Sequence, residues 1–252
     1  MGLPCGFLRI EDVGIITNLN PRDTIGTREI AMNLKHSTRL NIGCGLAVAK
    51  GWTNIDRSLN IYLSKSPRLK GMLFRLGLIS EEVLKADWRD IEIVRRDVTK
   101  GIPCEDNSVC FIYCSHMLEH LSRTASQRFL EECHRILTPD GILRLAVPDL
   151  HRSVSNYYAK TADGDQEMRE SAADCLIKDI GMFPANRKMT IFERLLGKGN
   201  SHLWAYDFFS ISRALRDAGF SKIVPTTYHN GTVPDLDKIE TREDSLFVEA
   251  SK

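Results

Sequence analysis

The sequence predicts an α/β protein built on a parallel sheet. Short apolar segments of strand length, among them residues 40–42, 109–114 and 142–147, alternate with stretches of helical periodicity. The segment 109–114 is almost continuously apolar, as expected for a strand that is covered on both faces. The first strand ends in two glycines one residue apart, Gly43 and Gly45, and such a turn lets the backbone approach a bound ligand closely. Together these features predict a ligand site at the carboxyl edge of the sheet.

The remaining elements follow in order along the chain. Residues 1–37 are expected to form an N-terminal extension packed on the core, with a short strand at 13–16 and a helix at 28–35. Apolar residues at helical spacing between Leu118 and Ile136 predict a helix that ends at the Pro-Asp-Gly of residues 139–141. A second amphipathic helix is expected at 207–218, stopped by Gly219. Further strands are expected at residues 54–56, 94–98, 222–226 and 245–250.

Two stretches are longer than the connections that a minimal parallel α/β domain needs. We therefore expect insertions at about residues 59–90 and 150–205. The first contains a basic amphipathic helix at 68–79, which could be a lid, a dimer contact, or a surface for anionic lipid or a phosphate-bearing substrate. An ordinary packing helix with a solvated face is the alternative. The second insertion has a helical pattern between Met168 and Ile180.

Composition narrows the class of protein. The chain has 252 residues and a net charge of +1, so its overall charge does not favour nucleic acid as a partner. It has no apolar run long enough to span a bilayer and its first twenty residues lack the features of a signal peptide. Its seven cysteines include no Cys-x-x-Cys, so we expect reduced thiols, no zinc ribbon and a cytoplasmic location. The sequence leaves the oligomeric state open.

The ligand-binding interpretation depends on Asp56 and on the connection that precedes it. Asp56 ends the second strand, where a carboxylate can accept hydrogen bonds from both hydroxyls of a ribose; a capping or solvated aspartate is the alternative. The connection over residues 46–53 is too short for the crossover helix whose N-terminus would hold a pyrophosphate, which counts against NAD or FAD. A nucleoside ligand without phosphates does not need that helix.

Five segments follow one another in a recognisable order: Leu-Asn-Ile-Gly-Cys-Gly (40–45), Gly-Trp-Thr-Asn-Ile-Asp (51–56), Arg-Asp-Val-Thr-Lys-Gly-Ile-Pro (96–103), Asn-Ser-Val-Cys-Phe-Ile-Tyr-Cys-Ser-His-Met-Leu-Glu-His-Leu (107–121) and Leu-Arg-Leu-Ala-Val-Pro-Asp-Leu (143–150). Together they resemble the class I S-adenosylmethionine-dependent methyltransferases, and most closely a bacterial type-11-like branch associated with sugar and cell-surface glycan pathways. The resemblance implies a Rossmann-like, seven-stranded, mostly parallel sheet with helices on both faces and an antiparallel last strand. The methyltransferase domain would then cover residues 38–252.

The resemblance also implies a set of residues that bind S-adenosyl-L-methionine: Asn41, Gly43, Cys44, Gly45, Asp56, Arg57, Asp97, Val98 and Ser115. In this assignment the glycine turn holds the methionine part, Asp56 the ribose, and Asp97 the exocyclic amine of adenine. Two features depart from the family: Cys110 stands where an acid is usual at the start of the fourth strand, and the glycine loop lacks a third glycine.

Candidates for catalysis and acceptor binding follow the later strands. His116 comes directly after the fourth strand and is our candidate general base, while Asp149 follows the fifth and could bind a polar acceptor or cap the next segment. His202 and Tyr206 are weaker candidates for substrate binding, and Trp204 is expected in the core.

The segment from His116 to His120 also matches the His-x-x-Glu-His pattern of inverted zinc peptidases. We do not favour that interpretation, because His116 falls at a strand-to-helix junction and no downstream acid is clearly positioned as a further ligand. Glu119 is expected to begin a helix and His120 to pack under the sheet. The sequence therefore predicts no metal site.

The resulting functional prediction is methyl transfer from S-adenosylmethionine to an oxygen or nitrogen of a small-molecule, sugar or glycan-type acceptor. Two alternatives remain: an RNA-modifying methyltransferase, which should show a basic face, and a non-catalytic protein that binds the cofactor.

Overall fold

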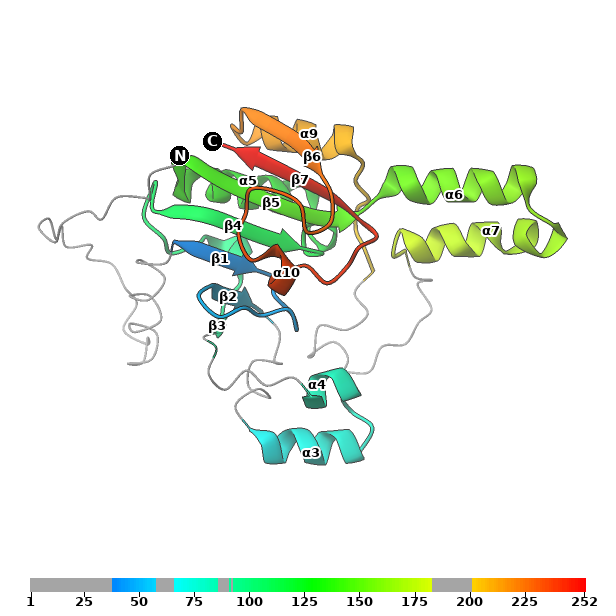
Figure 1. Ribbon diagram of the computed structural model, residues 1–252, viewed down its shortest axis with the longest axis horizontal. Helices are drawn as coiled ribbons and strands as arrows, with labels where there is room; N and C mark the ends of the chain where they lie inside the picture. Colours follow the sequence, from blue (N-terminus) through cyan, green and yellow to red (C-terminus); the bar gives the residue numbers. More distant parts are fainter. Residues whose placement is uncertain (1–37, 58–65, 86–90, 92, 183–200) are drawn as a thin grey trace, which may run out of the picture.

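The computed structural model describes residues 38–57, 66–85, 91, 93–182 and 201–252, and these form a seven-stranded sheet with helices packed against it (Figure 1). The strand order is β3-β2-β1-β4-β5-β7-β6. All pairs are parallel except β5–β7 and β6–β7, so the expected antiparallel last strand is confirmed. The strands are β1 Arg39–Ile42, β2 Thr53–Asp56, β3 Ile93–Arg95, β4 Val109–Ser115, β5 Leu137–Pro148, β6 Lys222–Thr226 and β7 Ser245–Ser251. The strand and helix expected within residues 1–37 lie outside the described residues.

Alternate residues of the central strands face two separate clusters of buried side chains. Ile112 and Cys114 of β4 belong to the main core, which also holds Phe129 of helix α5 (Arg123–Ile136) and Ile211 of helix α9 (Phe208–Asp217). Tyr113 points to the opposite face and joins a smaller cluster with Trp52 and with helix α10 (Leu236–Ile239). The sheet is therefore covered on both faces, by long helices on one and by a short helix with loops on the other.

The helix predicted between Leu118 and Ile136 is divided in the structure. Leu118–His120 form a single 3₁₀ turn, and α5 begins only at Arg123, where the Ser122 hydroxyl accepts a hydrogen bond from the Ala125 amide. At its other end α5 leads directly into β5, because Leu137 already pairs with Val109 of β4. The helix thus ends just before the Pro-Asp-Gly of residues 139–141, as predicted. These residues lie in an irregular part of β5, because the register with β4 shifts between the pairs Val109–Leu137 and Phe111–Ile142.

The first insertion contains two short helices, α3 (Pro67–Arg75) and α4 (Glu81–Lys85), which share a small apolar cluster of their own. The single helix predicted over 68–79 ends at Arg75, because Gly77 adopts a positive φ of 69° and turns the chain back. Its possible roles as lid, dimer contact or membrane surface stay predictions. No helix in the described part of the chain is long and apolar enough to cross a membrane.

The second insertion begins with an antiparallel pair of helices that projects from the carboxyl edge of the sheet (Figure 1). Helix α6 (Leu150–Asp163) was not predicted, whereas α7 (Gln166–Asp179) matches the expected pattern. Asp149 is the N-cap of α6 and accepts a hydrogen bond from the Arg152 amide. Asp149 thereby fixes the start of α6 directly after the end of β5.

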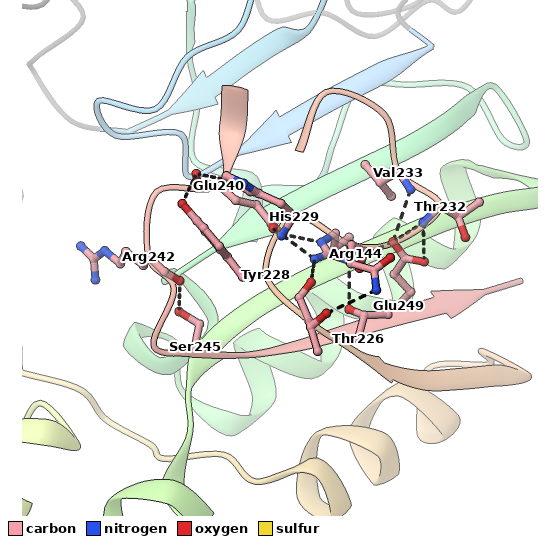
Figure 2. Close-up of polar contacts among 12 residues, drawn as sticks. Arg144, Thr226, Tyr228, His229, Thr232, Val233, Glu240, Arg242, Ser245 and Glu249 are labelled. Carbon is pink, nitrogen blue, oxygen red and sulfur yellow. Dashed lines mark hydrogen bonds and ion pairs between the residues drawn. The ribbon is translucent and has the colours of Figure 1, made fainter. Parts of the chain in front are cut away.

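A buried ion-pair network closes the second face of the sheet, and Figure 2 shows its members. Arg144 of β5 is fully buried and pairs with Glu240 beyond α10 and with Glu249 of β7. Each of the three guanidinium nitrogens donates to an oxygen, and the two carboxylates also accept the backbone amides of His229, Thr232 and Val233. We call Arg144, Glu240 and Glu249 the Arg144 cluster; its charged groups are fully hydrogen-bonded, as buried charges require.

Candidate functional site

The glycine turn after β1 has the backbone geometry that its sequence predicts. Gly43 and Gly45 have positive φ angles of 70° and 52°. The amides of Gly43 and Cys44 donate to the Ile55 carbonyl, and the Gly45 amide donates to Oδ2 of Asp56 at 2.8 Å. A Cβ on Gly43 would lie 3.0 Å from the Cβ of Met117, whereas one on Gly45 would meet no atom within 4 Å. Gly43 is thus needed for packing, and Gly45 faces open space.

Two of the predicted cofactor residues support this turn from within. Asn41 is buried, and its amide donates to the Ala47 carbonyl and to Oδ1 of Asn54. Cys44 is also buried, and burial raises the pKa of its thiol. Asn41 therefore positions the loop rather than presenting a free amide to a ligand, and Cys44 offers its backbone rather than its side chain.

Asp97 and Arg57 lie together after β3 and β2. Oδ1 of Asp97 accepts from both the hydroxyl and the amide of Thr99, while Oδ2 lies 3.7 Å from Nη1 of Arg57. The Thr99 hydroxyl is the main reason that the pKa of Asp97 lies below its usual value. Val98, the next residue, is buried in the main core, so only its backbone can meet a ligand.

The end of β4 places His116 at a bend. Its φ is +48°, and its amide donates to the Ala146 carbonyl of β5. Ring atom Nε2 lies 2.8 Å from the Ser245 hydroxyl, and Nδ1 lies 3.1 Å from Oε1 of Glu119. Ser115, one residue earlier, contacts the Tyr113 side chain. The ring of His116 thus links the carboxyl edge of the sheet to a buried carboxylate.

Glu119 is the unexpected member of this region. Its side chain is fully buried, yet neither carboxylate oxygen makes a directed hydrogen bond among the described residues, the approach of His116 Nδ1 included. Burial tends to raise its pKa, but the neighbouring His116 ring outweighs this and the pKa lies below its usual value. The rings of His120 and His202 meet edge to face beside it. We call His116, Glu119, His120 and His202 the Glu119 cluster.

A cavity of about 620 Å³ opens next to His116, between the ends of β4 and β5, the helices α6 and α7, and the segment before β7. The residues that line it, apart from Pro148 and Gly181, have polar or charged side chains: His116, Pro148, Asp149, Arg152, Ser153, Asn156, Lys178, Asp179, Gly181, His202, Thr241, Arg242, Glu243, Asp244 and Ser245. Three sequence candidates, His116, Asp149 and His202, therefore come together on one wall. The contributions of α6 and residues 241–245 carried no recognisable motif.

Two residues before α9 lie elsewhere than predicted. Tyr206 is buried in the main core, where its hydroxyl lies 3.4 Å from Ser126, so it is not part of the cavity wall. Trp204, expected in the core, is partly exposed, and the Arg123 guanidinium stacks 3.8 Å from its ring centre. The chain turns outward here because the amides of Leu203 and Trp204 both donate to the Glu119 carbonyl.

Residues 74–145, from α3 to the middle of β5, match the family model of a methyltransferase domain. The strand order and the antiparallel β7 agree with the sheet that the sequence resemblance implies. The matched segment is part of a methyltransferase domain. The match supports methyl transfer as the activity, and the open, glycine-lined turn beside Asp56 would fit a phosphate-free nucleoside such as the S-adenosylmethionine that the sequence resemblance implies.

Solved methyltransferase structures are similar at low identity. An S-adenosylmethionine-dependent methyltransferase from Archaeoglobus fulgidus is 12% identical, with 90% of this chain and 92% of that one covered and a TM-score of 0.44. A Thermotoga maritima methyltransferase, described as a possible histamine N-methyltransferase, is 15% identical, with 89% of each chain covered and a TM-score of 0.43. A structure of PigF with SAH is 12% identical, with a TM-score of 0.42; 86% of this chain is covered, but only 51% of that one, about half its length. These similarities are too remote to bear on the acceptor, and no curated protein matches the sequence.

Proposed function

We propose that this enzyme methylates an oxygen or nitrogen of a small polar acceptor of sugar type, bound in the cavity beside His116. The observation that carries the proposal is the lining of that cavity, in which Pro148 is the one apolar side chain among the described residues. Hydroxyl, amide, carboxylate and guanidinium groups converge there, as a ligand rich in hydroxyl groups requires. Acids and bases are nearly balanced on its walls, with four carboxylates against Arg152, Lys178 and Arg242, which favours a neutral or mixed acceptor over an RNA strand.

We infer that the cofactor lies along the ends of β1, β2 and β3. The backbone of the turn at 43–45 would hold its methionine part, the Asp56 carboxylate its ribose, and Asp97 with the Val98 backbone its adenine. Arg57 would stabilise the Asp97 carboxylate, and Ser115 would close the site toward β4. S-adenosylmethionine supplies a methyl group on a sulfonium, so the protein has mainly to align the acceptor and exclude water.

We further propose that His116 is the general base for the acceptor. In the tautomer that carries its hydrogen on Nδ1, 3.1 Å from Oε1 of Glu119, the lone pair of Nε2 would face the Ser245 hydroxyl at 2.8 Å, where an acceptor hydroxyl can take its place. Nε2 would then take the acceptor proton, and the Glu119 carboxylate would stabilise the resulting imidazolium. Asp149, on the same wall, would hold a second hydroxyl of the acceptor.

The domain itself is proposed to extend over residues 38–252, beyond the matched segment. In support, strands from Arg39 to Ser251 belong to one sheet, with the insertions at about 59–90 and 150–205 connecting its elements.

A screen with labelled methyl donor tests the acceptor class. The purified chain is incubated with nucleotide sugars, glycan fragments, small amines and a mixture of RNAs, and the transfer of label is measured. We expect label in the sugar-type compounds, and its loss in an Asp149→Asn variant that still binds S-adenosylhomocysteine by calorimetry. Label confined to RNA, or no label in any sugar-type compound despite cofactor binding, would overturn the proposal.

A further inference from the structure

The Glu119 cluster gathers one carboxylate and three imidazole rings, and in the described part of the chain Glu119 forms no ion pair with a lysine or arginine, only contacts with the rings of His116 and His202. Glu119, His120 and His202 each offer one ligand atom, and these atoms lie within 4.8 Å of one another. The Glu119 carboxylate is fully buried, and neither of its oxygens has a hydrogen bond among the described residues. A buried carboxylate without such bonds costs several kcal/mol unless a cation balances it.

The hydrogen bond of His202 settles which of its nitrogens faces Glu119 with a lone pair. Nδ1 lies 2.7 Å from the Ile180 carbonyl, which can only accept, so Nδ1 carries the hydrogen. In the neutral ring Nε2 then carries the lone pair, and this atom lies 3.9 Å from Oε1 of Glu119. A backbone carbonyl that fixes the outer nitrogen is the usual arrangement for a histidine that binds a metal.

In the His120 ring the two nitrogens have the opposite roles. Its buried Nδ1 has no partner in the described part of the chain, so the bond that its ring makes with the Ser201 backbone uses Nε2. With its hydrogen on Nε2, the ring leaves the Nδ1 lone pair free for a cation. Two imidazole lone pairs and one carboxylate therefore converge.

The surrounding backbone builds this arrangement. Glu119 and His120 share the 3₁₀ turn after β4, and the amides of Leu203 and Trp204 tie the segment after His202 to the Glu119 carbonyl. Gly181 ends α7 with a φ of +70°, and a Cβ there would lie only 2.1 Å from Nδ1 of His202. Glycine at this position is what lets the His202 ring close onto the cluster.

We propose that Glu119, His120 and His202 bind a divalent transition-metal ion, with Zn²⁺ the best match to two imidazoles and one carboxylate. Ligand atoms around tetrahedral zinc lie about 3.3 Å apart, so the side chains need to close by at most about 1.5 Å from their present spacing. Three protein ligands leave a coordination position open. Because His202 also lines the cavity, the ion would lie next to the proposed acceptor site. The site revises the sequence-based expectation of no metal, with His202 in the place where a downstream acid was sought.

Cobalt provides a readout that does not depend on activity. The full chain is stripped with EDTA and titrated with Co²⁺, following the visible d–d absorption, and then with Zn²⁺ in a calorimeter. We expect one equivalent of each metal to bind, and His202→Asn to weaken binding at least about tenfold. The matched control, His151→Asn, removes an exposed histidine of α6 outside the cavity and should bind as the wild type does.

Glu119→Gln tests whether a loss of metal binding could come from misfolding, because it keeps the shape of the buried side chain while removing its charge. It should weaken metal binding with an unchanged circular dichroism spectrum. No Co²⁺ binding by the wild type at millimolar concentration would overturn the proposal and would indicate a protonated histidine beside Glu119. Equal binding by wild type, His202→Asn and Glu119→Gln would overturn it as well. Neither result depends on the identity of the methyl acceptor.

Discussion

The Arg144 cluster and the Glu119 cluster are both buried groups of charged or ionisable side chains, but their bonding differs. In the Arg144 cluster every guanidinium nitrogen donates to an oxygen, and both carboxylates accept further backbone amides (Figure 2). In the Glu119 cluster the carboxylate is equally buried but has no directed hydrogen bond among the described residues. Satisfied buried charges stabilise a fold, whereas an unsatisfied carboxylate next to a cavity-lining histidine indicates a candidate ligand site.

The largest change in the free energy of unfolding is expected from removing the charge of Arg144. Arg144→Met leaves Glu240 and Glu249 buried without their partner, and we expect the free energy of unfolding to fall by about 3–5 kcal/mol. The measurement is urea denaturation followed by circular dichroism. Arg152→Met is the control, because Arg152 pairs with Asp244 at an exposed site and should cost no more than about 1 kcal/mol. Equal costs for the two variants would show that the network does not stabilise the fold.

Removal of His116 should affect turnover instead of stability. His116→Ala is expected to lower the turnover number about 10²- to 10⁴-fold if the ring is the general base, with a free energy of unfolding close to that of the wild type. Ser245→Ala removes only the hydroxyl that contacts Nε2 and should lose less than about tenfold by the same reasoning. Full turnover by His116→Ala on the acceptor found in the screen would exclude the proposed role.

Two glycines offer a matched pair, because each packs against one of the clusters. A Cβ on Gly231 would lie 2.2 Å from Oε1 of Glu249 and 2.3 Å from Nη1 of Arg144, so Gly231→Ala should lower the free energy of unfolding by about 1–3 kcal/mol. Gly181→Ala presses on the His202 ring instead, and its main effect should be a Co²⁺ affinity lowered about tenfold, since the ring is displaced while every ligand remains. If Gly181→Ala bound Co²⁺ normally, the ring would not need its present position.

The sheet was largely predictable because its strands are short apolar runs bounded by turn residues. Helix α6 and residues 139–141 differ from the prediction for physical reasons. Helix α6 projects from the sheet and buries almost none of its side chains, so no apolar periodicity identified it. Residues 139–141 follow the end of the helix as predicted, but they lie in an irregular part of β5, because Leu137 before them and Ile142 after them both pair with β4.

The candidate site was predictable only where a motif lies within one segment. The glycine turn and Asp56 were found in this way, and the structure joins them through the Gly45 amide. Arg144 was hidden in an apolar strand, since its partners Glu240 and Glu249 follow 96 and 105 residues later. Glu119 was assigned to a helix start because the approach of His202 depends on the tertiary path of the chain after α7.

The smallest change in stability, and the sharpest comparison between the clusters, is expected from Glu119→Gln. In EDTA its free energy of unfolding should fall by no more than about 1 kcal/mol and can rise, because the variant removes a buried charge that has no directed hydrogen bond to lose within the described structure. With Zn²⁺ at a hundred times the dissociation constant, the wild type should gain about 2.7 kcal/mol and the variant almost nothing. Thermal and urea unfolding with and without Zn²⁺ measure both quantities. A loss of 3 kcal/mol or more in EDTA would place Glu119 with the Arg144 cluster, as a carboxylate whose partner is another side chain and not a bound cation.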